Sequence, residues 1–279
     1  MTAAPLRHTE IVLEREEGTS FTVTIVRAVD AGPTAPVVLV QPAMGMKARY
    51  YPPLLEALAA AGVHAAVSEQ RGHEATGGRL PSRAYTFGYA DLVADLGLAV
   101  DAVRAELPDA RVVVLGHSLG GQIASLYAAR RPDALAGLIF VGSGTPHWRD
   151  FSRKLLVAAY GFPLVARIVG HFPGERLNFA GREARGLMRD WGHLARTGRF
   201  AGGDAGLADL EIPVLAISIE DDWLAPISSV DGLVDKLAAA TVTRVHVEEP
   251  GIDHFKWAKQ TDPVVPLITD WLKTVRVAP

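Results

Sequence analysis

Short apolar runs that lack alternation are the feature of this sequence that most limits its fold. Strands that are apolar on both faces belong in a parallel sheet that is covered on each side. Helical patterns separate these runs, and alternating strands and helices form βαβ units with right-handed crossovers. We therefore expect an α/β fold whose mostly parallel central sheet has helices on both faces. Its strands are predicted at Val37–Val40, Val63–Val67, Arg111–Leu115, Leu138–Val141, Val214–Ile219 and Thr243–Val247.

The remaining elements of the predicted core follow from spacing and turn residues. Two β-rich runs at Ile11–Arg15 and Phe21–Ala28 predict an antiparallel hairpin, because a turn containing Gly18 joins them. Apolar residues three and four positions apart predict a helix at Phe87–Leu107, which ends before Pro108. Further helices are predicted at Tyr51–Ala61, Gly120–Arg130 and Val264–Val275.

The alternation stops between about Pro146 and Asp209, where no convincing strand is found. We interpret this segment as a helical cap insertion at the C-terminal edge of the strands, where open α/β sheets bind ligands. The predicted division is residues 1–145 as the first part of the core, 146–209 as the cap, and 210–279 as the second part. A packing role is favoured over ligand contact for the aromatic residues of the cap, which are Trp148, Phe151, Tyr160, Phe162, Phe172, Trp191 and Phe200.

Composition excludes several classes of function. The 279 residues include no cysteine, so disulfides, thiolate metal sites and cysteine nucleophiles are excluded. A net charge of -3 leaves no basic excess for a nucleic acid. No H-x-x-x-H or H-E-x-x-H spacing occurs, so no metal site is predicted. No dinucleotide fingerprint or Walker loop is found either, and we expect no cofactor.

Membrane and export signals are weak. The segment Met1–Gly18 has no basic stretch leading into an apolar core, so no secretory signal is predicted. Leu155–Ala166 is the longest apolar stretch, but it contains Gly161 and Pro163 and is shorter than the roughly 18–20 residues of a membrane span. A buried helix or a pair of cap helices is favoured over membrane contact. We expect a cytoplasmic protein without stable membrane insertion.

One motif carries chemistry. Gly116, Ser118 and Gly120 form G-x-S-x-G inside the run VVVLGHSLGG. An apolar strand leads into the motif and a helix with small residues leads out of it. A serine on such a tight turn has a strained backbone, so the positions two before and two after it have no room for a Cβ. The helix that begins there directs free N–H groups and a positive dipole end at a developing oxyanion.

With this strand–turn–helix motif, the chain resembles the α/β-hydrolase fold family of serine hydrolases. The resemblance implies a triad in the order serine, acid, histidine. The stretch Gln41-Pro42-Ala43-Met44-Gly45 also resembles a bacterial branch of this family, in which some members hydrolyse the lactone of macrolide antibiotics.

Family order places the acid and the base downstream of Ser118. Asp222 follows the strand Val214–Ile219 and precedes a hydrophobic-Pro sequence, which fits the family spacing better than Asp221 or Glu220. His254 follows the last predicted strand and matches the Gly-x-x-His loop of the family, whereas His246 lies inside that strand. Ser118, Asp222 and His254 are therefore the expected catalytic residues.

The resemblance also implies an oxyanion hole with two N–H donors. One is Leu119, which directly follows the nucleophile. The other lies after Val37–Val40, where many relatives have His-Gly and this chain has Gln41-Pro42. Pro42 has no N–H, so Ala43 is the expected donor, with Met44 as the alternative. Arg71-Gly72-His73 resembles another family signature and is expected to brace the loops, and we expect no catalytic role for His117.

Together these features predict an esterase that cleaves a small-molecule carboxylic ester or lactone through an acyl-enzyme. The same fold and triad also serve thioesterases, C–C hydrolases and cofactor-free perhydrolases. A non-catalytic receptor for a small ligand is the alternative from a different class. Neither the oligomeric state nor the substrate-binding residues are predicted.

Overall fold

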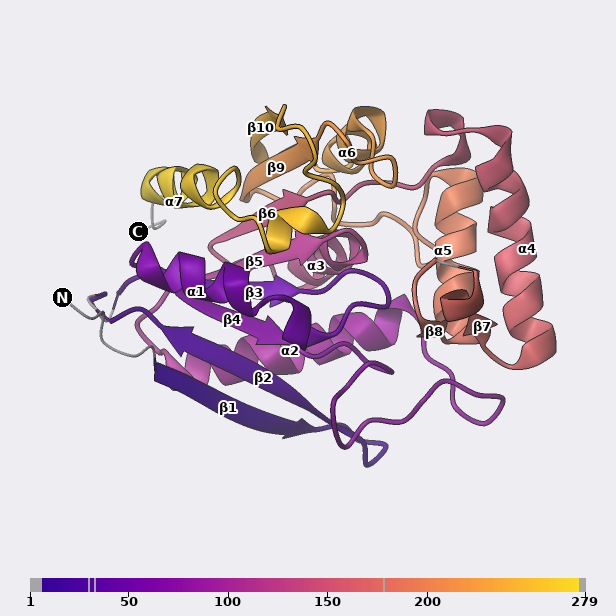
Figure 1. The fold of residues 1–279 in the computed structure, drawn as a ribbon, viewed down its shortest axis with the longest axis horizontal. Coiled ribbons are helices and arrows are strands. Elements are labelled where there is room, and N and C mark those ends of the chain that lie inside the picture. The colour runs from indigo at the N-terminus through magenta and orange to yellow at the C-terminus, as the bar shows by residue number, and fades with distance from the viewer. Residues whose placement is uncertain (1–6, 30, 33, 178, 276–279) are drawn as a thin grey trace.

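The computed structural model describes residues 7–29, 31–32, 34–177 and 179–275. Its centre is an eight-stranded sheet in the order β1-β2-β4-β3-β5-β6-β9-β10 (Figure 1). β2 pairs antiparallel with β1 and with β4, and all other pairs are parallel. This is the α/β-hydrolase architecture that the sequence predicts. The strands are β1 (Arg7–Glu14), β2 (Ser20–Arg27), β3 (Val37–Gln41), β4 (His64–Ser68), β5 (Val112–His117), β6 (Gly137–Val141), β9 (Pro213–Ile219) and β10 (Thr241–Val247).

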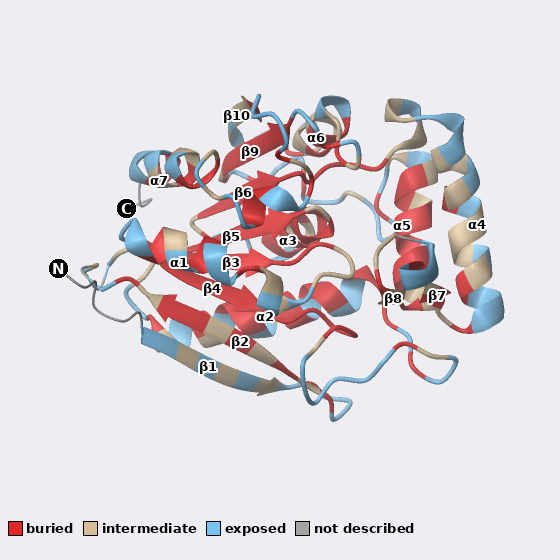
Figure 2. Ribbon diagram, in the orientation of Figure 1, coloured by how far each residue is buried: buried red, intermediate tan, exposed pale blue. Residues whose placement is uncertain are grey.

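The central strands are apolar along their whole length because both faces of the sheet are covered. Every residue of β3, β4, β5 and β6 is buried, as the sheet in Figure 2 shows. One face packs on α1 (Pro52–Ala60) and α7 (Val265–Thr274). The other face packs on α2 (Tyr89–Glu106), α3 (Leu119–Arg130) and α6 (Ile227–Val234). The sequence analysis did not assign α6 a range.

The segment 146–209, which we call the cap, leaves the sheet after β6 and returns at β9. Its main elements are α4 (Arg153–Val169) and α5 (Arg185–Thr197), which lie beside each other at one end of the sheet (Figure 1). It also contains a short antiparallel pair, β7 (Phe172–Pro173) and β8 (Arg182–Glu183), where the sequence predicted no strand. A strand of this length has no hydrophobic period to detect.

Several contacts join the cap to the body of the molecule, and two of them involve the loops after β3 and β4. His73, in the loop after β4, lies 3.0 Å from the Glu183 carboxylate, and both side chains are buried. Gly45, in the loop after β3, packs so closely on the cap that a Cβ there would lie 2.5 Å from the backbone nitrogen of Gly181. The cap therefore rests directly on loops that follow the parallel strands.

The loop after β4 is braced as the family signature implied. The Arg71 guanidinium donates to both carboxylate oxygens of Asp95 on α2, at 2.6 and 2.8 Å. Arg15 donates to the same carboxylate at 3.0 Å and to Glu74 at 2.7 Å. These charges are buried, and each is paired, as a buried charge must be. The network ties this loop to β1 and α2.

The segment Met1–Gly18, in which no secretory signal is predicted, lies partly outside the described residues, since residues 1–6 are not described. No helix among residues 7–29, 31–32, 34–177 and 179–275 is long and apolar enough to cross a membrane. Within the same ranges, no group of three or more His, Cys, Asp or Glu side chains is placed to hold a metal ion.

Candidate active site

Ser118 lies at the sharp turn between β5 and α3. Its φ of 54° and ψ of -117° are rare for a residue with a side chain. The motif glycines permit this turn: a Cβ at Gly116 would lie 2.2 Å from the backbone of Gly121, and one at Gly120 would lie 2.0 Å from the Gln41 carbonyl oxygen. The turn itself leaves no room for a Cβ at Gly116, and strand β3 leaves none at Gly120. This packing explains why the motif requires glycine on each side of Ser118.

His254 and Asp222 form a buried pair on neighbouring loops. The Nδ1 atom of His254 lies 2.7 Å from Oδ2 of Asp222, and the two side chains are 4% and 0% exposed. The other oxygen of this carboxylate, Oδ1, accepts the N–H groups of Leu224 and Ala225 at 2.9 and 2.8 Å. An ionised carboxylate with these donors holds Nδ1–H of the imidazole and leaves Nε2 as the acceptor.

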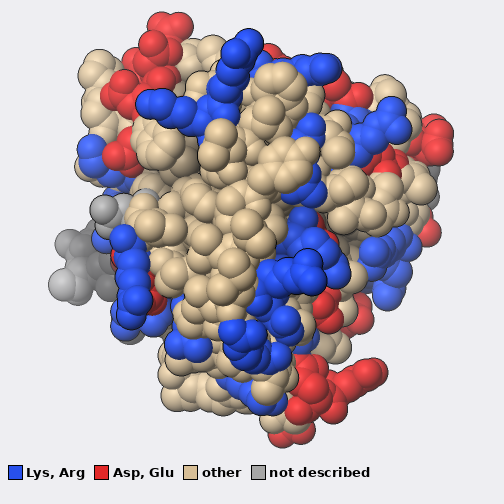
Figure 3. All heavy atoms as spheres, turned by 90° about the vertical axis from the view of Figure 1, so that its right-hand side faces the viewer, with Lys and Arg blue, Asp and Glu red and all other residues tan. Residues whose placement is uncertain are grey.

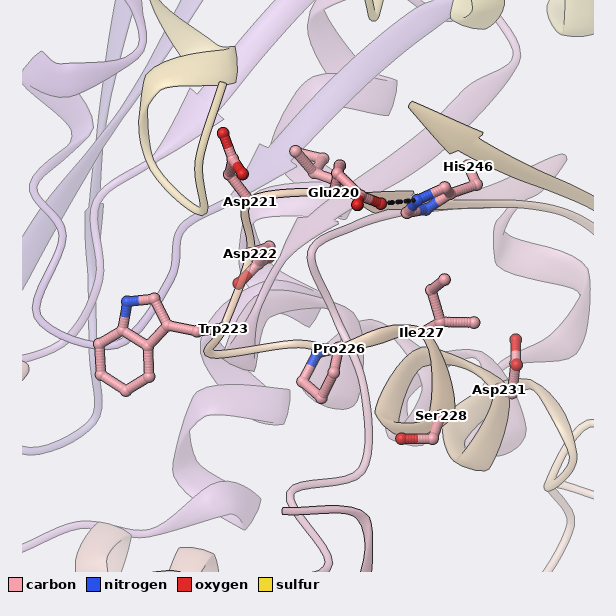
Figure 4. Close-up of a pocket in the computed structure, with 10 residues that line it drawn as sticks. Glu220, Asp221, Asp222, Trp223, Pro226, Ile227, Ser228, Asp231 and His246 are labelled. Carbon is pink, nitrogen blue, oxygen red and sulfur yellow. Dashed lines mark hydrogen bonds and ion pairs between the residues drawn. The ribbon is translucent and has the colours of Figure 1, made fainter. Parts of the chain in front are cut away.

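The other acids of this loop have different partners. The Asp221 carboxylate accepts the N–H of Gly251 at 2.9 Å. Glu220 pairs with His246 at 2.7 Å, as the dashed line in Figure 4 shows. Asp221 and Asp222 leave the loop in different directions (Figure 4), so only Asp222 reaches His254. The structure thus brings Asp222 and His254 together and gives Asp221, Glu220 and His246 other partners.

Ser118 and His254 line one cavity of about 660 Å³ between the sheet and the cap. Leu119, Ala43 and Met44 line it too. Most of its remaining wall comes from the cap and from the loops after β9 and β10, with Gln122 of α3 and the charged Lys154 of α4 also present. The apolar part of this wall includes Phe151, Leu155, Ala158, Phe162, Leu177, Phe179, Trp191, Trp223, Leu224 and Phe255.

The cap aromatics divide between packing and cavity. The Phe162 ring stacks on Trp191 with centroids 5.8 Å apart, and both side chains line the cavity. Phe172 is fully buried and packs against Phe162 without lining the cavity. Tyr160 is 63% exposed on the outer face of α4. The predicted packing role therefore holds for Phe172, is shared with the cavity at Phe162, and is wrong for Tyr160.

The two expected oxyanion donors differ in availability. The Leu119 N–H has no hydrogen-bond partner among the described residues, as expected at the start of a helix. The Ala43 N–H donates to the hydroxyl of Tyr51 at 3.2 Å, whereas the Met44 N–H has no partner in the part of the chain that the structure describes. The available donors on this cavity are therefore Leu119 and Met44.

The loop after β6 supports the site and was missed by the sequence analysis. Gly142 has a φ of 53°, and a Cβ there would lie 2.7 Å from Oδ2 of Asp222 and 3.2 Å from Nδ1 of His254. The Ser143 hydroxyl donates to the carbonyl oxygen of Ser118. The Gly-Ser-Gly sequence after a predicted strand is a turn signal that could have directed attention to this loop.

His117 is fully buried beneath the cavity. Burial lowers its pKa well below the ordinary value of 6.5, and the nearby His254 imidazole lowers it further. Its Nδ1 atom lies 2.9 Å from the Tyr51 hydroxyl, and its Nε2 atom lies 2.7 Å from the carbonyl oxygen of His254. Both ring nitrogens therefore have partners, and the neutral imidazole is favoured.

The strained serine between β5 and α3 and the cap above a mostly parallel sheet define an α/β-hydrolase-fold protein. Residues 32–190 match the family described as "Serine aminopeptidase, S33", and the chain belongs to this family within the α/β-hydrolase superfamily of serine hydrolases.

Individual relatives agree with this assignment. The chain is 26% identical over 244 residues to a monoacylglycerol lipase of Mycolicibacterium smegmatis, an alignment that covers 81% of this chain and 82% of that protein. A thermostable carboxyl esterase from Bacillus coagulans has the same fold, with a TM-score of 0.72, 18% identity, and coverage of 98% of this chain and all of that one. Mouse α/β-hydrolase domain-containing protein 10 is also similar in fold, with a TM-score of 0.66, 14% identity and coverage of 96% of this chain and 100% of that one. The resemblance to macrolide esterases stays a prediction.

Proposed function

We propose that this protein is a serine esterase in which Ser118, His254 and Asp222 form the catalytic triad. The observation that carries the proposal is that Ser118 and His254 line the same cavity while His254 is bonded to Asp222. A serine hydroxyl is a poor nucleophile unless a base takes its proton and a third group orients that base. The name of the M. smegmatis relative, a lipase, adds support for an ester substrate.

In the proposed reaction, Nε2 of His254 takes the hydroxyl proton while Oγ of Ser118 attacks the ester carbonyl carbon. Asp222 stabilises the imidazolium that results. The tetrahedral intermediate collapses when the imidazolium returns the proton to the leaving alcohol oxygen, and an acyl-enzyme remains. His254 then deprotonates a water molecule that attacks the acyl carbon, and the acid is released with Ser118 restored.

We assign the oxyanion hole to the N–H groups of Leu119 and Met44. Both line the cavity, and neither has another partner among the described residues, whereas the Ala43 N–H is already bonded to Tyr51. Removal of one such donor costs roughly 3 kcal/mol of transition-state stabilisation in comparable enzymes. The departure from His-Gly at Gln41-Pro42 therefore does not deprive the site of a second donor.

The substrate we propose is an uncharged ester with an apolar acyl or alcohol group. The cavity wall is largely aliphatic and aromatic, and such a wall favours apolar groups over charged ones. A lactone or thioester presents the same reacting carbonyl. Cleavage within the cytoplasm stays a prediction.

The test is covalent labelling with an organophosphonate, combined with hydrolysis of p-nitrophenyl esters. Wild-type protein is expected to be labelled once, at Ser118, and to release p-nitrophenol continuously. Ser118→Ala is expected to lose both properties. A protein that gives at most one slow burst of product would instead be a receptor, and labelling that persists in Ser118→Ala would refute the assignment of the nucleophile.

A further inference from the structure

A chain of buried hydrogen bonds connects the three loops that carry the proposed chemistry. The Ala43 N–H donates to the Tyr51 hydroxyl at 3.2 Å, and that hydroxyl lies 2.9 Å from Nδ1 of His117. Nε2 of His117 lies 2.7 Å from the carbonyl oxygen of His254. The chain therefore runs from the loop after β3, through the residue next to Ser118, to the loop after β10.

Only one arrangement of hydrogens satisfies the whole chain. An amide N–H can only donate, so the Tyr51 oxygen accepts from Ala43 and gives its single hydrogen to Nδ1 of His117. A carbonyl oxygen can only accept, so Nε2 of His117 carries the hydrogen that faces His254. Each hydrogen bond has one possible direction, and reversing any of them would leave a buried polar group without a partner.

The groups of this hydrogen-bond chain have little freedom to move. Tyr51 and His117 are fully buried, and the Tyr51 ring contacts His117 edge-on. At the far end, the indole N–H of the buried Trp257 donates to the same His254 carbonyl at 3.0 Å. The His254 backbone is thus held by two donors from different elements.

We propose that Tyr51 and His117 are positioning residues, which hold the base loop and the oxyanion loop at a set distance across the nucleophile. By binding the Ala43 N–H, Tyr51 also sets the orientation of the loop in which the Met44 N–H remains available to the cavity. Neither residue lines the cavity, so neither contacts the substrate. This inference rests on the proposed esterase function.

The experiment compares Tyr51→Phe, His117→Leu, His117→Gln and the double variant Tyr51→Phe/His117→Leu. Tyr127→Phe is the matched control, because the Tyr127 hydroxyl is buried without a hydrogen-bond partner among the described residues. Active sites are titrated with an organophosphonate, and kcat and KM for p-nitrophenyl butyrate are expressed per titrated site. Thermal unfolding is followed in parallel.

We expect Tyr51→Phe to lower kcat roughly tenfold and His117→Leu up to about 100-fold, with KM within about twofold of wild type, because misplacement of reacting groups by about 1 Å can cost about 100-fold in rate. His117→Gln keeps a side-chain N–H and should recover part of the loss. In the double variant, Tyr51→Phe should add little to His117→Leu, because both changes break one chain.

The inference would be overturned by a kcat for Tyr51→Phe equal to that of Tyr127→Phe, or by losses that multiply in the double variant. A purely structural role would lower the unfolding temperature and the number of titrated sites while leaving kcat per site unchanged, and that too would overturn it. If His117→Leu does not fold, Tyr51→Phe and His117→Gln decide. Failure of the esterase proposal itself is recognised separately, since wild type would then give no sustained turnover or Ser118→Ala would retain it.

Discussion

The sheet and the cap both consist largely of apolar residues, but these residues have different roles in the two regions. In β5 every residue is buried, and Ser118 directly follows the strand at a turn that close packing at Gly116 and Gly120 fixes. In α4 only Ala159 and Ala166 are buried, although most of the helix is apolar. One of its faces lines the cavity, and the opposite face exposes Val157, Tyr160, Leu164 and Ile168. The sheet thus fixes the position of the proposed nucleophile, and the cap forms much of the cavity wall around the proposed substrate.

Charge separates the two regions as well. α4 carries Arg153, Lys154 and Arg167 and has no acidic residue. Figure 3 views the molecule from the side of the cap, and Lys and Arg side chains gather there along an uncharged band, with Asp and Glu at the periphery. The acids of the loop after β9, in contrast, lie beside the proposed triad. We expect substitutions in the loops at the sheet to change the rate of the chemical step. Substitutions in the cap should change the choice of substrate.

The largest expected effect comes from the acid of the pair. Asp222→Asn keeps the shape of the side chain but favours the wrong imidazole tautomer, and we expect kcat to fall by about 10⁴-fold. Asp221→Asn is the matched control and should lower kcat less than about threefold, because its partner is the Gly251 backbone. Steady-state hydrolysis of p-nitrophenyl butyrate measures both, and equal losses would mean that the two acids share the role.

Substitution of two glycines, one in the loop after β6 and one in α4 of the cap, compares the two regions directly. Gly142→Ala would force a Cβ to within 2.7 Å of Oδ2 of Asp222, at a φ of 53°, so we expect kcat to fall roughly 100-fold. Gly161→Ala lies within α4 with no atom within 4 Å of the added Cβ, and should stabilise the fold by about 0.5–1 kcal/mol without changing kcat. Kinetics and thermal unfolding of both variants test this. Full activity of Gly142→Ala would show that the loop after β6 does not support the acid–base pair.

The two faces of α4 give a third contrast. Leu155→Trp fills part of the cavity, so we expect kcat/KM for p-nitrophenyl octanoate to fall roughly tenfold relative to the acetate ester. Leu164→Trp places the same ring on the exposed face of the helix and should leave this ratio unchanged. Chain-length profiles of the two variants decide whether the cavity beneath the cap holds the acyl group. The same loss in both would contradict it.

The smallest expected effect concerns the junction of the two regions. Burial alone would lower the pKa of His73, but the charge of Glu183 and its hydrogen bond raise the pKa above the ordinary 6.5. The pair therefore contributes its full stability below the pKa of the unfolded chain, and this contribution is lost as the pH rises through the higher pKa of the folded protein.

The unfolding temperature of wild type should accordingly exceed that of His73→Gln by more at about pH 5.5 than at about pH 9. Thermal unfolding of both proteins across this range measures the difference. A gap between them that does not change with pH would mean that folding does not change the pKa of His73.

The sequence was most informative where local chemistry sets the structure. The elbow at Ser118 needs glycine on each side, and this need is visible within five residues of sequence. The pairing of Asp222 with His254 depended on the order of elements in the family, because no local pattern brings together residues 32 positions apart. Spacing to a hydrophobic-Pro sequence favoured Asp222 over Asp221, and the structure gives the two carboxylates different partners.

What could not be predicted depends on contacts between distant segments. Tyr51 looks like an ordinary apolar-helix residue in sequence, and its role emerges only from its contacts with Ala43 and His117. The sequence alone favoured Ala43 as the second oxyanion donor, and it gives no sign that the Ala43 N–H contacts the Tyr51 hydroxyl. The junction of His73 with Glu183 spans 110 positions and leaves no periodic signal.

The close packing of Gly45 on Gly181 has a consequence for protein engineering. Caps from related hydrolases cannot be exchanged here as independent modules, because the seam has no room for a methyl group at Gly45. A chimera that brings a bulkier residue to position 181 would push on His73, whose Cε1 atom lies 2.6 Å from where the new Cβ would be. Successful grafts should therefore inherit both glycines, or redesign the loop after β3 together with the incoming cap.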